Sequence, residues 1–172
     1  MKTVMSVMIA SLLSLASFTC NEQKVDNSTV KSLDLNRYLG TWYEIARFDH
    51  SFERGLTHAK AHYSLNENGT LTVTNSGLKD GKHKVSMGKA KLTSTAGRLR
   101  VSFFGPFYSD YRVLMVSDDY NYALVGSSGA KHLWILSRFP EIPGGILKQI
   151  VSVAAGRGYD TRNLIWVEQT TY

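Results

Sequence analysis

The sequence of 172 residues predicts an all-β fold: an eight-stranded up-and-down antiparallel barrel, with one C-terminal α-helix packed outside and a final short strand. Three observations predict it. Between residues 41 and 137, short apolar or alternating stretches are separated by turn residues, and none has a helical period. Eight such stretches joined mostly by short links favour closure, because closure removes exposed sheet edges. One stretch with a helical period follows them.

The turn residues divide this region into eight expected strands. Asn68-Gly69 favours a tight hairpin, because both residues adopt positive φ at low cost, and Gly77–Gly81 is expected to form another turn. The clearest inside/outside alternation runs from Leu99 to Phe103. The expected strands are residues 41–48, 59–65, 70–76, 82–93, 99–103, 110–116, 122–127 and 132–137.

Helical signals occur at both ends of the predicted barrel. Asp34 is suited to cap a short helical turn over residues 35–39, which would plug one end of the barrel. Residues 146–155 carry one apolar stripe at helical spacing, and Gly156 ends it. A last strand over residues 164–170 is expected to pack outside with this helix.

The first strand is apolar on both faces. Because side chains alternate along a strand, every second residue lies on one face and the residues between them lie on the other. Neither set is polar, so we expect this strand to be covered on both sides, with the external helix and last strand covering Ile45. The two sets are Trp42, Glu44, Ala46 and Phe48 on one face, and Tyr43, Ile45 and Arg47 on the other.

The N-terminal region resembles a bacterial lipoprotein signal. One early lysine precedes the apolar stretch Val4–Ala16, and Cys20 stands at the processing boundary. The expected organisation is a lipoprotein signal peptide over residues 1–19, a tether over 20–32 and a barrel domain over 33–172. Cys20 is then the acylated first residue. The alternative is ordinary secretion with cleavage near Ala16, which leaves Cys20 as a free thiol.

Composition excludes several classes of function. The net charge of +6 comes from scattered basic residues, which argues against nucleic-acid binding and favours weak attraction to anionic lipid headgroups. A single cysteine excludes an internal disulfide. The chain has no G-x-S-x-G motif, and His58 and His62 would stand roughly 13 Å apart in a strand, too far to share a metal ion. No catalytic residue, metal or cofactor is expected.

Three motifs, in order and with matching spacing, resemble the signature motifs of the lipocalins. They are Gly40-Thr41-Trp42, the segment Asp118–Val125, and Leu133–Arg138, which ends in Arg138. The likeness runs from about residue 35 to residue 167. It is greatest to the bacterial outer-membrane members of the family.

The resemblance implies a barrel open at one end and closed at the other by the N-terminal helix. It also implies that Trp42 lies against Arg138 at the closed end, beside Gly40, as a structural signature. Such a cation–π contact contributes about 1–2 kcal/mol when shielded from water.

Strand alternation, with the phase of some strands taken from the family, predicts the residues that face a ligand pocket. Two roles remain open for Glu44: a structural partner near the closed end, or a group that sets the polarity of the pocket floor. The expected lining is Glu44, Ala46, Tyr63, Val73, Asn75, Leu99, Val101, Phe103, Tyr111, Val113, Met115, Trp134 and Leu136.

The predicted function is non-covalent binding, storage or transport of lipids, especially fatty acids or lysophospholipids, by a lipoprotein anchored through Cys20 to the bacterial outer membrane. Two alternatives remain: a lipocalin-like enzyme using Glu44 as acid or base, and a filled barrel that serves as an envelope interaction module. The sequence leaves open a homodimer and a periplasmic or surface-facing orientation.

Overall fold

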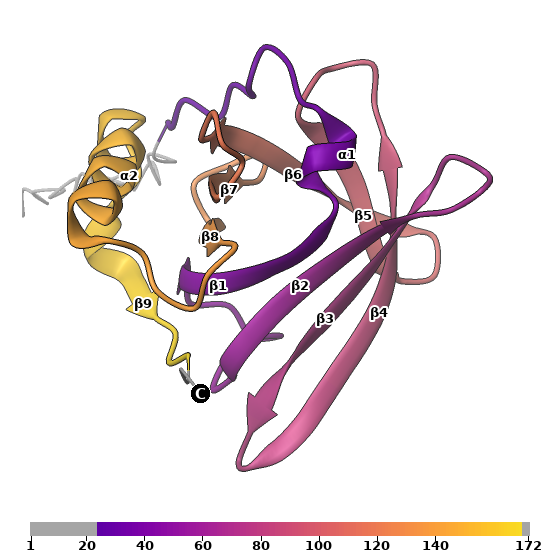
Figure 1. Ribbon diagram of the computed structural model, residues 1–172, viewed down its shortest axis with the longest axis horizontal. Helices are drawn as coiled ribbons and strands as arrows, with labels where there is room; N and C mark the ends of the chain where they lie inside the picture. Colours follow the sequence, from indigo (N-terminus) through magenta and orange to yellow (C-terminus); the bar gives the residue numbers. More distant parts are fainter. Residues whose placement is uncertain (1–23, 170–172) are drawn as a thin grey trace, which may run out of the picture.

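The computed structural model describes residues 24–169, so Cys20 and the predicted signal peptide lie outside the described part of the chain. Eight strands form a closed antiparallel barrel, which confirms the predicted fold class (Figure 1). The strands are β1 (Gly40–Phe48), β2 (Thr57–Leu65), β3 (Leu71–Lys79), β4 (Lys82–Leu92), β5 (Arg98–Phe104), β6 (Phe107–Val116), β7 (Tyr122–Gly126) and β8 (Leu133–Ser137).

The remaining elements lie at one end or on the outside of this barrel. The short helix α1 (Leu35–Tyr38) precedes β1, and the side chain of Asp34 caps it by accepting from the Arg37 amide. The long helix α2 (Gly144–Gly156) and the 3-10 turn η1 (Thr161–Asn163) lead to β9 (Leu164–Trp166). Figure 1 shows α2 and β9 together on one side of the barrel, beside β1, β7 and β8.

Strand β1 closes the barrel by pairing with three partners. Its first half, Gly40–Tyr43, pairs with β2, and its second half pairs with β8. Beyond the end of the β2 pairing, Ala46–Phe48 pair with β9 on the edge that β2 leaves open. The strand therefore joins the barrel to the external layer.

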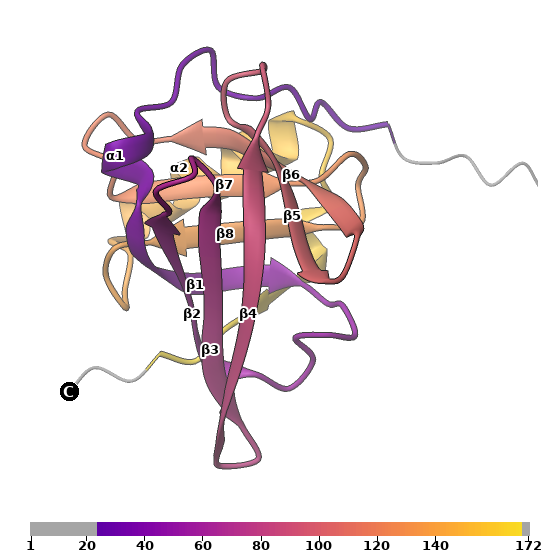
Figure 2. The same cartoon turned by 90° about the vertical axis from the view of Figure 1, so that its right-hand side faces the viewer.

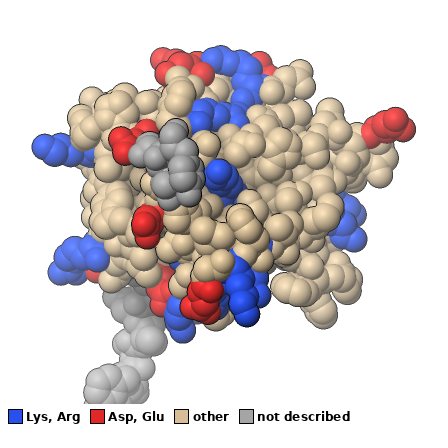
Figure 3. Space-filling model, turned by 60° about the horizontal axis from the view of Figure 1, so that its bottom comes forward, with Lys and Arg blue, Asp and Glu red and all other residues tan. Residues whose placement is uncertain are grey.

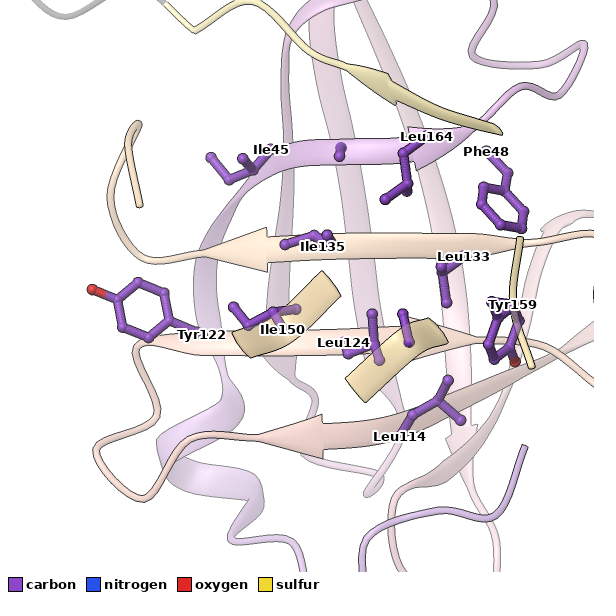
Figure 4. Close-up of a cluster of buried hydrophobic side chains, with 12 residues drawn as sticks. Ile45, Phe48, Leu114, Tyr122, Leu124, Leu133, Ile135, Ile150, Tyr159 and Leu164 are labelled. Atoms are coloured by element: carbon purple, nitrogen blue, oxygen red, sulfur yellow. The ribbon is translucent and has the colours of Figure 1, made fainter. Parts of the chain in front are cut away.

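Two hydrophobic clusters lie on opposite sides of the sheet. The inner cluster lines the barrel, and the outer cluster lies between the barrel and α2 (Figure 4). Ile45 belongs to the outer cluster together with Ile150 and Ala154 of α2, which agrees with the predicted external cover. The buried inner residues are Tyr38, Trp42, Tyr63, Leu71, Val73, Ala90, Leu99, Val113, Ala123, Val125 and Leu136. The buried outer residues are Ile45, Ala46, Phe48, Leu114, Tyr122, Leu124, Leu133, Ile135, Ile150, Ala154, Tyr159 and Leu164.

A β-bulge in β1 corrects the predicted position of Ala46. The pairing with β8 shifts between Glu44 and Ala46, which face Leu136 and Ile135 respectively. An extra residue in one strand reverses the inside/outside phase beyond it. Ile45 and Ala46 therefore both join the outer cluster, whereas Arg47 turns inward. The placement of Ala46 inside the barrel, and of Phe48 on its face, was wrong.

A second bulge, in β6, corrects the position of Met115. The register with β7 shifts between Val113 and Met115. Val113 belongs to the inner cluster, but Leu114 belongs to the outer one and Met115 packs against it. Strict alternation from Val113 predicted Met115 inside, and the extra residue at the bulge moves it outside.

Two predicted boundaries also change. Gly77 lies within β3 rather than in a turn, and a Cβ there would stand 2.9 Å from the Thr57 carbonyl oxygen of β2. Glycine is needed for this close approach between strands. Contacts with the barrel domain also occur before the boundary predicted at residue 33, because the Asp26 and Val30 amides donate to the backbone oxygens of Arg157 and Val113.

The closed end is organised by Trp42 and Arg138. The Arg138 guanidinium carbon lies 3.8 Å from the centroid of the Trp42 ring. The same guanidinium donates to the backbone oxygens of Arg37, Tyr38, Leu39 and Thr41. Gly40 enters β1 at φ 90°, which glycine adopts without strain. One arginine thus joins β8, α1 and the start of β1.

Candidate ligand-binding site

The barrel interior brings together most of the residues predicted to line a pocket. Ten of the thirteen stand in or beside the inner cluster. Tyr63, Val73, Leu99, Val113 and Leu136 are buried in that cluster, Val101, Phe103, Tyr111 and Trp134 pack against it, and Asn75 pairs with the cluster residue Ala61. Glu44 also lies inside, whereas Ala46 and Met115 do not.

The interior retains accessible space. Val101, Phe103, Tyr111 and Trp134 pack against the inner cluster, yet each keeps part of its surface accessible. Their strands, β5, β6 and β8, are central in the sheet. A fully packed interior would bury such side chains completely. The partial exposure therefore indicates that these side chains do not pack the interior completely.

Three tyrosines form a hydroxyl cluster on the closed-end side of this interior. The hydroxyls of Tyr38 and Tyr111 are 2.7 Å apart, and the Tyr63 hydroxyl donates to that of Tyr111 at 3.0 Å. Burial raises the pKa of each hydroxyl above its ordinary value, so all three are neutral at physiological pH. The amide oxygen of Asn75 is buried without a hydrogen-bond partner among residues 24–169.

An ion-pair cluster, absent from the sequence prediction, lies inside the barrel beyond the bulge of β1. The Arg47 guanidinium donates to the Glu44 carboxylate at 2.6 Å, and both side chains are buried. The charge of Glu53 acts on the Glu44 carboxyl, and the Trp134 indole donates to Glu53 at 3.1 Å. We name Glu44, Arg47 and Glu53 the carboxylate–arginine cluster.

This cluster ties down the loop between β1 and β2. Arg47 donates to the backbone oxygens of Glu53 and Leu56 at 2.8 and 3.2 Å. His50 is buried in the same loop, with its Nε2 atom 3.1 Å from a Glu53 oxygen. Burial, followed by the charges of His132 and Arg47, lowers the pKa of His50 to about 4, so the ring is neutral at pH 7.

The two carboxyl groups share one arginine. Burial, followed by the charge of Glu53, raises the pKa of Glu44 to about 8 despite the opposing effect of Arg47. Burial also raises the pKa of Glu53. One guanidinium balances one carboxylate, so the pair retains a proton near neutral pH. This arrangement favours the structural role for Glu44, since its carboxyl accepts a hydrogen bond from the buried Arg47.

Replacing Glu44 with glutamine is expected to flatten the dependence of stability on pH. The native Glu44 holds its proton up to about pH 8, whereas the unfolded side chain releases it near 4.5, so the parent loses stability as pH rises. Between pH 6.5 and 8, above the ordinary pKa of His50, this loss is about 1–2 kcal/mol. Urea unfolding at several pH values measures it. An unchanged slope in Glu44→Gln would contradict the assignment.

Two cavities open near the loops opposite α1. One, of about 400 Å³, is lined by residues of β5, β6, β8 and the β1–β2 loop, including Phe52 and Trp134. Trp134 lines this cavity and also packs against the inner cluster. The other, of about 550 Å³, lies beside Asp160 and Asn163 and contains none of the predicted lining residues.

The surface charge, possible metal ligands and helix lengths of residues 24–169 bear on other kinds of site. On the face in Figure 3, basic and acidic side chains are interspersed in a largely uncharged surface. Within residues 24–169, no three His, Cys, Asp or Glu side chains gather as metal ligands. Over the same range, no helix is both long and apolar enough to span a membrane.

The comparisons with known proteins agree with this geometry. A family model described as a lipocalin-like domain matches residues 33–169. The chain belongs to the lipocalin family. It is 47% identical over 146 residues to the outer membrane lipoprotein Blc of Escherichia coli K12, covering 83% of this chain and 82% of that protein. The Vibrio cholerae protein of the same name is 45% identical over 145 residues, covering 81% and 85%.

Solved lipocalin structures share the fold. Insecticyanin from the tobacco hornworm superposes with a TM-score of 0.70 at 22% identity, over 84% of this chain and 85% of that one. Membership in the family assigns this chain a binding or transport role. The interior of the barrel, with its apolar wall, hydroxyl cluster and carboxylate–arginine cluster, is the candidate site for that role.

Proposed function

We propose that this lipocalin binds, stores or transports lipids, with the acyl chain of a fatty acid or lysophospholipid inside the barrel. It acts at the bacterial outer membrane, held there by a lipid anchor on Cys20. The observation that carries the proposal is the accessible apolar wall formed by Val101, Phe103, Tyr111 and Trp134. Each buried methylene contributes roughly 0.8 kcal/mol, so a long acyl chain gains enough to offset its ordering.

Polar groups within the same space support an amphipathic ligand. The Tyr111 hydroxyl and the unpartnered Asn75 amide oxygen offer hydrogen bonds to a headgroup or ester. The relatives named as outer membrane lipoproteins support the location, and their similarity covers more than four fifths of this chain. The partial exposure of the wall argues against the filled-barrel alternative.

Native mass spectrometry of the protein purified without detergent is the direct test. We expect a mass increment of a fatty acid or lysophospholipid, released by organic extraction. A barrel that carries no lipid and fails to bind fluorescent acyl probes would overturn the proposal. Mass spectrometry of the mature chain also tests the anchor, since an unmodified Cys20 excludes it, and sedimentation equilibrium decides between a monomer and a homodimer.

Filling the barrel is expected to abolish binding. Val101→Trp adds a large side chain to the interior wall, and we expect acyl-probe affinity to fall at least about tenfold, since several methylenes lose their space. Lys91→Trp is the matched control, because Lys91 pairs with Arg100 on the neighbouring strand and is exposed. Titration of a fluorescent fatty acid measures both. Equal affinities would place the ligand outside the barrel.

A further inference from the structure

The barrel rim opposite α1 carries exposed aromatic side chains. Phe104 and Phe107 face each other across the β5–β6 turn and are 77% and 79% exposed. Phe52, at the tip of the β1–β2 loop, is 61% exposed and lines the 400 Å³ cavity together with Tyr108. We name Phe52, Phe104 and Phe107 the aromatic rim. Such apolar groups at loop tips mark a surface that another apolar phase covers.

Unpaired basic side chains stand next to this rim. Lys89 and Lys91 lie 5.8 and 5.2 Å from the ring of Tyr108, the residue after Phe107. Arg100 donates to the Tyr108 backbone oxygen at 2.9 Å. None of these three basic side chains forms an ion pair within residues 24–169, whereas Asp110 is taken up by two other arginines. The neighbourhood of the rim is therefore positively charged.

The N-terminal segment leaves the fold on the same side. The Asn27 amide donates to the backbone oxygen of Ser128, in the β7–β8 loop, at 2.7 Å. Figure 2 shows this segment running over the top of the barrel and leaving on the side opposite α1. Cys20 precedes Asn27 by seven residues, a length that spans at most about 25 Å when extended. A lipid on Cys20 would hold this side close to the bilayer.

We propose that the aromatic rim docks the open end of the barrel onto the surface of an anionic lipid bilayer. Phenylalanine side chains insert at the boundary of headgroups and acyl chains, while Lys89, Lys91 and Arg100 meet the anionic headgroups. The barrel entrance then faces the lipid phase, and a ligand passes between bilayer and interior without crossing water. The orientation rests on the anchor of the proposed function, but the docking surface itself does not.

Vesicle flotation of an anchor-free chain tests the docking. The chain of residues 20–172 carrying Cys20→Ser retains every described residue and cannot be acylated. With vesicles of equal parts phosphatidylethanolamine and phosphatidylglycerol, we expect Phe104→Ser/Phe107→Ser to weaken partitioning by about tenfold or more. Lys89→Gln/Lys91→Gln weakens it less, and the effect decreases with salt. Vesicles of phosphatidylcholine alone bind more weakly.

Phe139→Ser is the matched control, because Phe139 is 50% exposed and follows β8 at the closed end. It should leave partitioning unchanged, and all variants should keep the parent melting temperature and acyl-probe affinity. Equal partitioning by Phe104→Ser/Phe107→Ser and the parent would overturn docking, as would no binding by the parent. A parent dimer that the same double substitution dissociates, without vesicle binding, would assign the rim to a second copy instead. If the parent does not bind acyl probes, that result would count against the proposed function and not against docking.

Discussion

Arg47→Met is expected to destabilise the fold by about 3–5 kcal/mol at pH 7, because removing one member of a buried ion pair leaves its partner uncompensated. Arg47 is the only cation in the carboxylate–arginine cluster among the described residues, and its loss leaves Glu44 and Glu53 together. It also removes the hydrogen bonds to the backbone oxygens of Glu53 and Leu56. The free energy of urea unfolding measures the loss, and amide exchange over residues 49–56 measures the loosened loop.

Lowering the pH should reduce the loss of stability that Arg47→Met causes. As pH falls toward 5, protons neutralise both carboxyl groups of the variant, so the cost of burying them without Arg47 decreases. Arg47→Met/Glu44→Gln should recover part of the stability at pH 7 because one uncompensated carboxyl is gone. Arg54→Met is the surface control: its pair with Asp49 is exposed, and such pairs contribute little to stability. A loss that is equally small for Arg47→Met would contradict the assignment.

The fold could be predicted from the sequence because its determinants are local. Turn residues such as Asn68-Gly69 and alternation such as that from Leu99 to Phe103 specify strands and links one at a time. The number of strands, the external helix and the barrel closure follow from those local signals. The prediction that the external helix and last strand cover Ile45 also follows from local sequence, because the first strand is apolar on both faces.

The candidate site was predicted less completely, because bulges carry no sequence signal in this chain. The extra residues in β1 and β6 reverse which side chains of the strand face the interior. Ala46 and Met115 therefore lie outside, and Arg47 lies inside. The charged cluster also depends on Glu53 and His50, which come from a loop with no periodicity. An arginine three residues after an inward glutamate was the one available hint, and strict alternation assigned it to the opposite face.

Trp42→Ala is expected to cost about 3–5 kcal/mol, the range for deleting a large buried aromatic side chain. The Trp42 ring is fully buried, lies 5.0 Å from the ring of Tyr38, and donates from Nε1 to the Tyr38 backbone oxygen at 2.8 Å. Its removal opens a cavity between α1 and the barrel floor. Thermal and urea unfolding measure the loss. Trp166→Ala is the matched control, since Trp166 on β9 is 55% exposed and should cost well under half as much.

A double-mutant cycle separates the two ways in which Arg138 can close the barrel. Its guanidinium covers the indole at 3.8 Å and also donates to four backbone oxygens of α1 and β1. If the cation–π contact matters, Trp42→Leu and Arg138→Leu together should cost about 1–2 kcal/mol less than the sum of the two single losses. Additive losses would mean that Arg138 acts through its hydrogen bonds alone. Because Arg138 donates to three backbone oxygens of residues 37–39 and Trp42 to one, Arg138→Leu should then increase amide exchange in residues 35–39 more than Trp42→Leu does.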